Sequence, residues 1–396
     1  MRATHDIVIS GGGIAGLSAA AAFGSAGFSV LCVDPAPPVT DAASTGADLR
    51  TTAFLQPSIP VLERAGVWDR LAPHAMPLQV MRIVDAGGVE PIARVSHDFD
   101  AADVSDQPFG WNLPNWLLSR ELLARLTELP NVDFRPGVGS AGITTRETKG
   151  LVRLSDGTSA AARLVVAADG RNSPLRNALG ISVHTMRYGQ KALAFAVTHP
   201  VPHENVSTEI HRSGGPFTLV PLPDRDGQPC SAVVWMERGP EVARLQALPA
   251  PAFEAEMTAR SGGLFGPLKL ASALTAWPII SQIAERFDAE RVALMAEAAH
   301  VVPPIGAQGL NMSLADLRVL LELATPETLG NRTMLAQYHR RRWPEVQARV
   351  AGVDVLNRAS MAGAQPLRDL RARVLDLMYA AAPVRHGLMH LGMGMR

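Results

Sequence analysis

HDIVISGGGIAGLSAAAAFGSAGFSVLCVD, residues 5–34, combines two strand-like runs with a glycine-rich turn and a helix of small residues between them. HDIVIS is a short β-branched run typical of a buried parallel strand, and SVLCVD is a second such run. Gly11, Gly13 and Gly16 follow the first strand at the spacing G-x-G-x-x-G, and Asp34 ends the second strand. This order predicts a Rossmann-like βαβ unit that opens an α/β domain.

The glycine spacing points to a ligand as well as to a fold. The first glycine permits a tight turn, the second lets a pyrophosphate approach the backbone, and the third lets helix and strand pack closely. An acid at the end of the second strand can accept hydrogen bonds from ribose hydroxyls. A bare glycine triplet also occurs in ordinary strand-to-helix turns, but the ordered context favours a dinucleotide site, with FAD and NAD both open at this point.

Composition excludes several other classes of protein. The 396 residues suffice for two or three domains, and Lys plus Arg equals Asp plus Glu at 37 each, which argues against a nucleic-acid partner. Cys32 and Cys230 show no paired spacing, and no metal-ligand cluster stands out, so we predict no disulfide framework and no metal site. The start lacks a secretory pattern, and Gly24 and Gly27 break the apolar run 14–33, so we expect a cytoplasmic protein without a membrane span.

The rest of the chain alternates between helix-like and strand-like patterns. Residues 48–71 indicate a loop and a helix, Gly87 and Gly88 mark a β-hairpin turn, and residues 142–166 suggest a β-meander. Residues 332–380 are predicted helical, with interruptions at Pro344 and Pro366. We predict a discontinuous nucleotide-binding domain over 1–80, 105–183 and 282–345, an antiparallel β-sheet domain over 81–104 and 184–281, and C-terminal helices and a tail over 346–396.

A second helix start is predicted far from the first. RVALMAEAAHVVPPIGAQGLNMSLADL, residues 291–317, gives a buried strand, then Glu297 and His300, then a proline-glycine loop and a leucine-striped helix. The free N–H groups of Gly309, Leu310 and Asn311 would favour negative charge at its open end. A reduced flavin carries such charge and NAD does not, although a simple packed turn is the plainer alternative.

These segments together resemble the flavin-dependent aromatic hydroxylases, most closely the ubiquinone-biosynthesis hydroxylases of the UbiH/UbiF type. The resemblance covers nearly the whole chain through GGGIAG with Asp34, LRTTAF, LERAGVWD, MRIVD, the helix of Arg120, LVVAADGRNSPLR, YGQKA and AEAAHVVPPIGAQGLNMSLADL. It implies a two-domain α/β (α+β) fold, in which a Rossmann-like FAD-binding domain carries an antiparallel β-sheet substrate domain.

The resemblance also implies roles for individual residues. It assigns the FAD pyrophosphate and adenosine to the first βα unit and the phosphates and ribose to two arginines. It places Asp169 in a second short motif near the cofactor, the isoalloxazine at the late helix start, and Pro304 beside the substrate. The implied cofactor-binding residues are Gly11, Gly13, Ile14, Ala15, Gly16, Asp34, Arg50, Arg120, Asp169, Glu297, Gly309, Leu310 and Asn311.

Two stretches depart from the family pattern. Ala296-Glu297 stands where the family usually has Gly-Asp, so the carboxylate that is expected to bond the FAD ribitol or ribose reaches about one methylene further. PPIGAQG replaces the commoner HPIAGQG but keeps a proline, Gln308 and Gly309. We expect the carboxylate role to persist with altered geometry.

Other candidate residues are interpreted from the local sequence pattern around them. Phe217, Leu219 and Trp235 alternate on strand-like runs and are predicted to line an apolar substrate pocket, with core packing as the alternative. His300 after a buried strand is more typical of a hydrogen-bonded structural residue than of a general base. The tail after Asp376 lacks acids, and we expect it to pack on its own domain, or else to dock on a membrane face or a partner.

The resemblance implies an FAD-dependent monooxygenase that hydroxylates a polyprenylated phenol in ubiquinone biosynthesis through a flavin hydroperoxide. NAD(P)H or another donor would reduce the flavin, molecular oxygen would be the co-substrate, and no side chain is assigned as catalytic because the flavin carries the chemistry. Partners of a biosynthetic complex or peripheral contact with the inner membrane face would suit an insoluble substrate. The alternatives are a hydroxylase of a small soluble aromatic, a reductase of a double bond, and a scaffold subunit with or without flavin.

Overall fold

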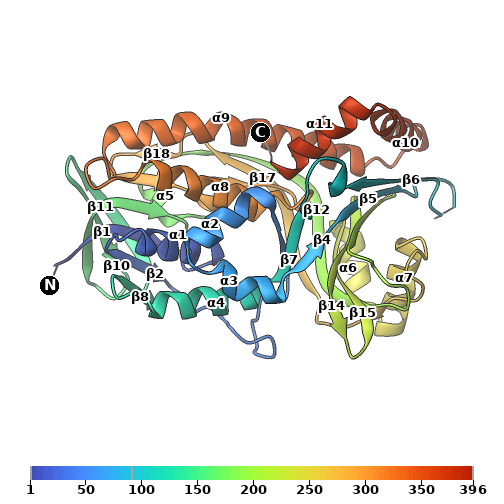
Figure 1. The fold of residues 1–396 in the computed structure, drawn as a ribbon, viewed down its shortest axis with the longest axis horizontal. Helices are drawn as coiled ribbons and strands as arrows, with labels where there is room; N and C mark the ends of the chain where they lie inside the picture. Colours follow the sequence, from blue (N-terminus) through green and yellow to red (C-terminus); the bar gives the residue numbers. More distant parts are fainter. Residues whose placement is uncertain (1, 91, 395–396) are drawn as a thin grey trace.

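A computed structural model describes residues 2–90 and 92–394 of the chain. Residues 1, 91, 395 and 396, which fall within the predicted domain segments, lie outside this description. The predicted mixed α/β architecture is confirmed: helices pack on a largely parallel sheet at one end of the molecule, and a second sheet forms the other end (Figure 1).

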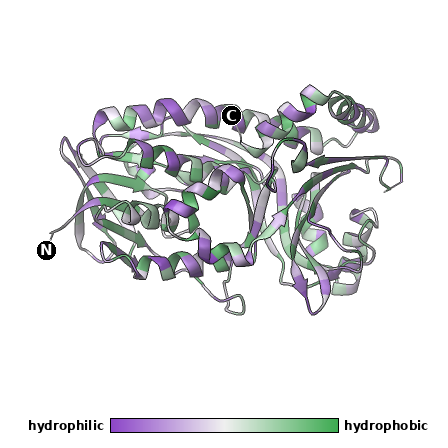
Figure 2. Ribbon diagram, in the orientation of Figure 1, coloured by the Kyte–Doolittle hydropathy of each residue, from purple (hydrophilic) through white to green (hydrophobic). Residues whose placement is uncertain are grey.

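The first sheet grows from the glycine-rich βαβ unit. Its central strand segments, residues 7–9, 30–33, 164–167 and 292–294, are apolar and buried because helices cover the sheet. Figure 2 shows the middle of this sheet as mainly hydrophobic. β1 pairs in parallel with both β2 and β11, while β11 pairs in parallel with the late β19, so the two ends of the chain complete one sheet. Its strand order is β18 (Asp288–Ala289), β19 (Val292–Leu294), β11 (Ser159–Ala167), β1 (Arg2–Ser10), β2 (Val30–Asp34) and β8 (Val132–Pro136), with β10 (Lys149–Leu154) and β9 (Ser140–Arg146) added through β11.

The predicted meander and hairpin are both present. β9, β10 and β11 pair antiparallel in succession, and the Gly87–Gly88 turn separates β5 (Val80–Asp85) from β6 (Val95–Asp100), which pair antiparallel. A strand that the prediction missed, β3 (Thr51–Leu55), lies in the segment that was expected to be a loop. It forms a small sheet with β7 (Gly110–Pro114) and β4 (Met76–Leu78), between the two larger sheets.

The second sheet is mainly antiparallel, with one parallel pair that the sequence did not indicate. That pair joins β13 to β5, because β5 arrives from the first half of the chain. Helices α6 and α7, also not predicted, cover its outer face and bury an aromatic cluster there. The strand order is β20 (His300–Val301), β17 (Thr275–Ala284), β12 (Val183–Thr198), β15 (Gln228–Arg238), β14 (Pro216–Arg225), β13 (Val206–His211), β5 and β6, with β16 (Lys269–Leu270) on β12.

The helices include a long one that runs from the first sheet to the second. Pro344 was predicted to interrupt the helical region, and this is wrong, because α9 continues from Arg332 to Ser360 through it. Buried Tyr338, Arg342 and Val346 on either side anchor the helix and compensate for the lost backbone hydrogen bond. The others are α1 (Ile14–Ser25), α2 (Ile59–Arg64), α3 (Trp68–Leu71), α4 (Asn115–Thr127), α5 (Pro174–Ala178), α6 (Gly239–Gln246), α7 (Ala250–Arg260), α8 (Gln308–Leu323), α10 (Gln365–Ala380) and α11 (Ala382–Met393).

A buried ionic network joins α8, α9 and the segment before them. Asp316 of α8 is fully buried, and its carboxylate lies 2.7 Å from His300 Nε2 and 2.8 Å from Arg342 Nε. It also accepts a hydrogen bond from the backbone N–H of Ala296 at 3.1 Å. Burial alone would raise the pKa of Asp316, but the two basic partners hold that pKa below its usual range. His300 is therefore held in a structural network, as expected.

Asp316→Asn is expected to lower the free energy of unfolding by about 3 kcal/mol, because it leaves the Arg342 guanidinium buried with a neutral partner. Urea unfolding followed by circular dichroism measures this change. Asp106→Asn, at an exposed loop position, is the matched control and should unfold like the wild type. Equal stability of the two variants would contradict the structural role of the network.

Candidate active site

The glycine turn after β1 is shaped by close backbone contacts. Gly11 has φ of +114°, and a Cβ on it would overlap the carbonyl oxygen of Ala168. A Cβ on Gly16 would overlap the carbonyl oxygen of Gly11. Gly13 differs, since a Cβ there would have no atom within 4 Å and would project into open space. The first and third glycines therefore allow close packing, and the second leaves room for a ligand.

Asp34 lies at the end of β2 as predicted, beside this turn. Its Oδ2 accepts a hydrogen bond from the Gly12 N–H at 2.5 Å, and its Oδ1 accepts one from the Ala36 N–H at 2.8 Å. The carboxylate is thereby fixed at the cavity wall, where Gly13, Ile14 and Ala15 also lie. The structure thus brings the glycine turn, the start of α1 and the acid to one place.

The second helix start faces the same cavity. Gly306 and Ala307 have positive φ values of 62° and 54°, which turn the chain sharply into α8, and Gly309 and Leu310 in the first turn line the cavity. Asn311 has a different position from its neighbours. Its side chain is buried and bonds to the Leu55 N–H at 2.9 Å and to the Ala53 carbonyl at 2.8 Å, so it ties α8 to β3.

Arg50 and Glu297 both line the cavity, as predicted. The Arg50 guanidinium pairs with both oxygens of Asp48 at 2.7 Å and lies 5.3 Å from the ring centre of Trp277. Burial alone would raise the pKa of Asp48, yet the Arg50 hydrogen bonds lower it. Glu297 is half exposed, and its Oε2 lies 3.5 Å from Arg171 Nε. The Glu297 carboxylate, which stands where the family usually has an aspartate, is therefore still at the cavity.

Like Asn311, the predicted cofactor residues Arg120 and Asp169 do not line the cavity. Arg120 pairs with Glu121 at 2.8 Å on the exposed side of α4, and its neighbour Ser119 is the one that lines the cavity. Asp169 is enclosed between β1 and α5, where it accepts 3.3 Å hydrogen bonds from Ser10 Oγ and the Leu175 N–H. Within the described residues its Oδ1 has no partner, and burial raises the pKa of this carboxyl.

The cavity has a volume of about 1480 Å³ and extends from the glycine turn to the second sheet. Its lining is mainly apolar on the sheet side and includes Pro304, as predicted. Part of the sheet face that lines it carries small side chains, several of them side by side on neighbouring strands: Ala194, Ala232, Val234, Thr218, Val220 and Ser207.

The prediction that Phe217, Leu219 and Trp235 line this pocket is corrected by the structure. All three are at most 3% exposed and pack in the aromatic core beneath α6 and α7, on the opposite face of the sheet. Alternation along a strand puts residues 218 and 220 on the cavity side when 217 and 219 face away. The sequence showed the alternation, but not the two helices that attract the bulky face.

Sequence reasoning missed the polar residues on this wall. Glu209 and His211 of β13 line the cavity, as does Asn112 of β7. The pattern V-S-T-E-I-H places Ser207, Glu209 and His211 on one face of a strand, which was the available signal.

These features fit a bound FAD. The open position at Gly13 leaves space at a helix start for a pyrophosphate, Asp34 lies where a ribose would follow, and the start of α8 offers backbone N–H groups further along the same cavity. The volume exceeds the roughly 300–1,000 Å³ of usual ligand pockets, so the cavity has room for a second molecule beside the cofactor.

Comparison with known proteins agrees with this fit. The family model described as FAD binding domain matches residues 4–353, and the chain belongs to this family of FAD-binding proteins. More particularly, it groups with the ubiquinone-biosynthesis hydroxylases, so the predicted resemblance is confirmed. It is 32% identical to the ubiquinone hydroxylase UbiL of Rhodospirillum rubrum over 98% of this chain and 89% of that protein.

Two further likenesses are more distant. The 3-demethoxyubiquinol 3-hydroxylase of Escherichia coli is 26% identical over 92% of each chain. The crystal structure of p-nitrophenol 4-monooxygenase PnpA from Pseudomonas putida DLL-E4 superposes with a TM-score of 0.78 over the full length of both chains at 19% identity. This last likeness shows the fold alone.

Gly13→Val is expected to fold normally but to bind FAD at least ~10-fold more weakly, a loss of about 1.4 kcal/mol, because its side chain occupies the space beside the helix start. FAD content is measured from visible absorbance after purification, and thermal unfolding of the apoprotein reports folding. Gly16→Ala is the contrasting variant: its methyl group overlaps backbone, so it should lose about 1–3 kcal/mol of stability. Full FAD content in Gly13→Val would refute the pyrophosphate assignment.

Proposed function

We propose that the chain is an FAD-dependent monooxygenase that hydroxylates the ring of a polyprenylated phenol in ubiquinone biosynthesis. The observation that carries this proposal is a single cavity that continues from the FAD-type helix starts to an apolar sheet wall. The names of its relatives, a ubiquinone hydroxylase and a 3-demethoxyubiquinol 3-hydroxylase, support the substrate class.

The role of the chain itself would be to bind the cofactor and the substrate, to orient them and to shield them from water. Bound FAD, reduced by NAD(P)H or another donor, supplies the activation of molecular oxygen for insertion into the ring. The first turns of α1 and α8 would hold the pyrophosphate and the negatively charged edge of the flavin with backbone N–H groups. The apolar wall would keep water away from the reacting centre, which limits side reactions with water.

The cavity dimensions favour a substrate with a long tail over a small soluble aromatic. Beyond the sheet wall the cavity is bordered by apolar side chains of α10 and α11, among them Leu370, Val374, Leu388 and Met389. A small phenol would leave this apolar part of the cavity unused, whereas a prenyl tail would bury it.

Val220→Trp is expected to lower kcat/KM for a prenylated phenol by at least ~10-fold, because the indole fills the space of the substrate on the sheet wall. Oxygen-dependent product formation by the FAD-loaded enzyme is the measurement, with FAD content as a check on folding. Pro223→Trp, at the exposed end of the same strand, is the matched control. Undiminished turnover in Val220→Trp would show that the substrate lies elsewhere, and a wild type that hydroxylates no prenylated phenol would refute the proposed function.

We also propose that the mouth of the cavity docks on a lipid surface. Leu367, Leu370, Val374 and Leu377 form a stripe on α10, called here the rim stripe, and they are 43–72% exposed. Three of them also line the cavity, so the exposed apolar surface continues into the substrate space. No helix of the described residues is long and apolar enough to cross a bilayer, so contact would be peripheral.

Leu370→Asp combined with Leu377→Asp is expected to weaken binding to vesicles of phosphatidylcholine and phosphatidylglycerol by ~100-fold or more, because each leucine that enters the lipid contributes about 1.5–3 kcal/mol. Vesicle co-sedimentation measures the partition. Leu264→Asp, which removes an exposed leucine beyond α7, should bind like the wild type. If the wild type did not sediment with vesicles, the rim stripe would have no lipid role.

A further inference from the structure

A carboxylate–imidazole pair lies on the mainly apolar sheet wall of the cavity. Glu209 and His211 are two residues apart on β13 and therefore face the same side. His211 Nε2 lies 2.8 Å from Glu209 Oε1, and both residues line the cavity. Glu209 is only 6% exposed, so its charge lies in a largely desolvated place with the imidazole as its partner.

The pair lies within reach of a molecule held under the loop that begins α8. Ile305 of that loop packs in one cluster with Met236 and Val234 of β15. Val234 pairs with Thr218, and Thr218 pairs with Glu209, so Glu209 is two strands away from Val234. Two strand spacings amount to about 10 Å, which a substituted aromatic ring can span.

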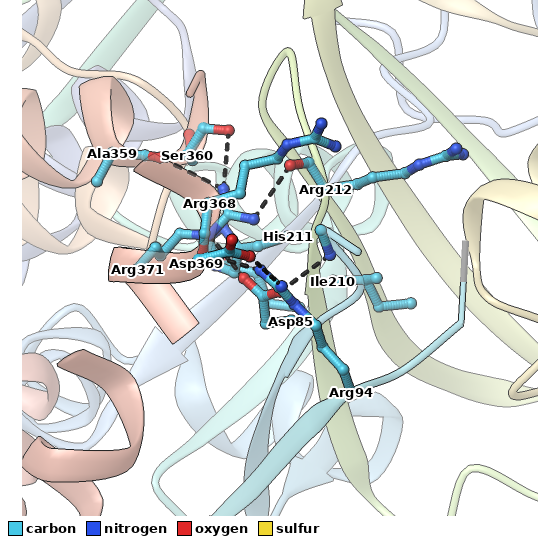
Figure 3. A network of polar contacts seen from close by, with 12 residues as sticks. Asp85, Arg94, Ile210, His211, Arg212, Ala359, Ser360, Arg368, Asp369 and Arg371 are labelled. Carbon is cyan, nitrogen blue, oxygen red and sulfur yellow. Dashed lines mark hydrogen bonds and ion pairs between the residues drawn. The ribbon is translucent and has the colours of Figure 1, made fainter. Parts of the chain in front are cut away.

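The Asp85 carboxylate next to the pair is already satisfied by two arginines (Figure 3). Asp85, which lies opposite His211 on β5, accepts hydrogen bonds from Arg94 at 2.6 Å and from Arg371 of α10 at 2.8 Å. Arg371 also donates to the carbonyl of Arg212 at 3.0 Å, and the Ala86 N–H donates to the carbonyl of His211 at 2.8 Å. This network fixes the backbone at the end of β13 and so holds His211 in place. It does not engage the imidazole ring, which contacts Glu209 through Nε2.

The imidazole has one unused nitrogen. Within the described residues, His211 Nδ1 is buried and has no hydrogen-bond partner. A buried nitrogen without a partner costs free energy that a ligand group can recover. With Nε2–H donating to the Glu209 carboxylate, Nδ1 is the acceptor of the ring.

We propose that Glu209 and His211 bind the hydroxyl group of the substrate phenol and that His211 takes its proton. This inference rests on the proposed function. The phenol O–H bond breaks, its electron pair stays on oxygen, and an N–H bond forms at Nδ1, while Glu209 stabilises the imidazolium. The resulting phenolate has more electron density at its ortho and para carbons, which assists attack by electrophilic oxygen. When the hydroxylated ring regains its aromatic form, the attacked carbon releases its hydrogen as a proton to water, and the imidazolium returns its proton to the phenol oxygen.

The test compares a phenol with its methyl ether on the FAD-loaded enzyme. The probes are 2-farnesylphenol and 2-farnesylanisole, and binding is followed by the change each causes in the visible spectrum of bound FAD. His211→Asn is expected to bind the phenol about 10-fold more weakly and the ether as the wild type does. Its kcat on the phenol should fall by roughly 100-fold, as general-base loss predicts.

Two further variants complete the design. Glu209→Gln keeps the shape of the wall, removes the charge and should reduce the preference for the phenol in the same direction; it carries the test if His211→Asn loses FAD. Thr208→Val, on the opposite face of the same strand and also buried, should leave the phenol-to-ether ratio unchanged.

The outcomes separate the two levels of the proposal. If the wild type hydroxylates the phenol but both variants keep its phenol-to-ether binding ratio and its kcat, the roles of Glu209 and His211 are refuted and the proposed function stands. If the wild type hydroxylates no prenylated phenol, the proposed function falls and takes this inference with it. A selective loss of phenol binding in His211→Asn and Glu209→Gln supports the inference.

Discussion

The geometry of the site depends on the buried carboxylate of Asp316. It accepts hydrogen bonds from the Ala296 backbone, from His300 and from Arg342, and so joins the segment after β19, the strand before the proline-glycine loop, and the long helix α9. The loop and the first turn of α8 lie between these anchors. An ionic group in a dry interior is costly unless all its partners are in place, so the network allows one arrangement of this segment and disfavours others.

Much of the fold could be predicted because local pattern and global structure agree. The glycine turn with Asp34, the meander over β9 to β11, the β5–β6 hairpin and the late strand β19 all carry strong periodic or turn signals, and each is present. Pro344 shows where such signals fail. Tertiary burial of Tyr338 and Val346 outweighs the cost of an internal proline, and that burial is invisible to a local pattern.

The site was predictable in its backbone parts and less so in its side chains. The spacing of glycines in the sequence indicates where the fold needs open space or close backbone contact. Gly13 and Gly309 accordingly line the cavity, as expected. The direction of an arginine side chain depends on which acidic groups lie within its reach. Arg120 pairs with its neighbour Glu121 instead of facing the cavity. The sheet wall was assigned to the wrong face because a strand pattern gives two faces, and only the position of α6 and α7 decides between them.

The closure of the first sheet by β19 has a consequence for biosynthesis of the protein. A nascent chain that has reached β12 already contains the glycine turn, but not the strand that flanks β11 or the helix start of α8. Because long-range strand pairs form only after both partners exist, the amino-terminal part must wait with an exposed sheet edge until most of the chain has left the ribosome. Binding of the cofactor is then a late event in folding. Before it, aggregation through the exposed sheet edge competes with folding.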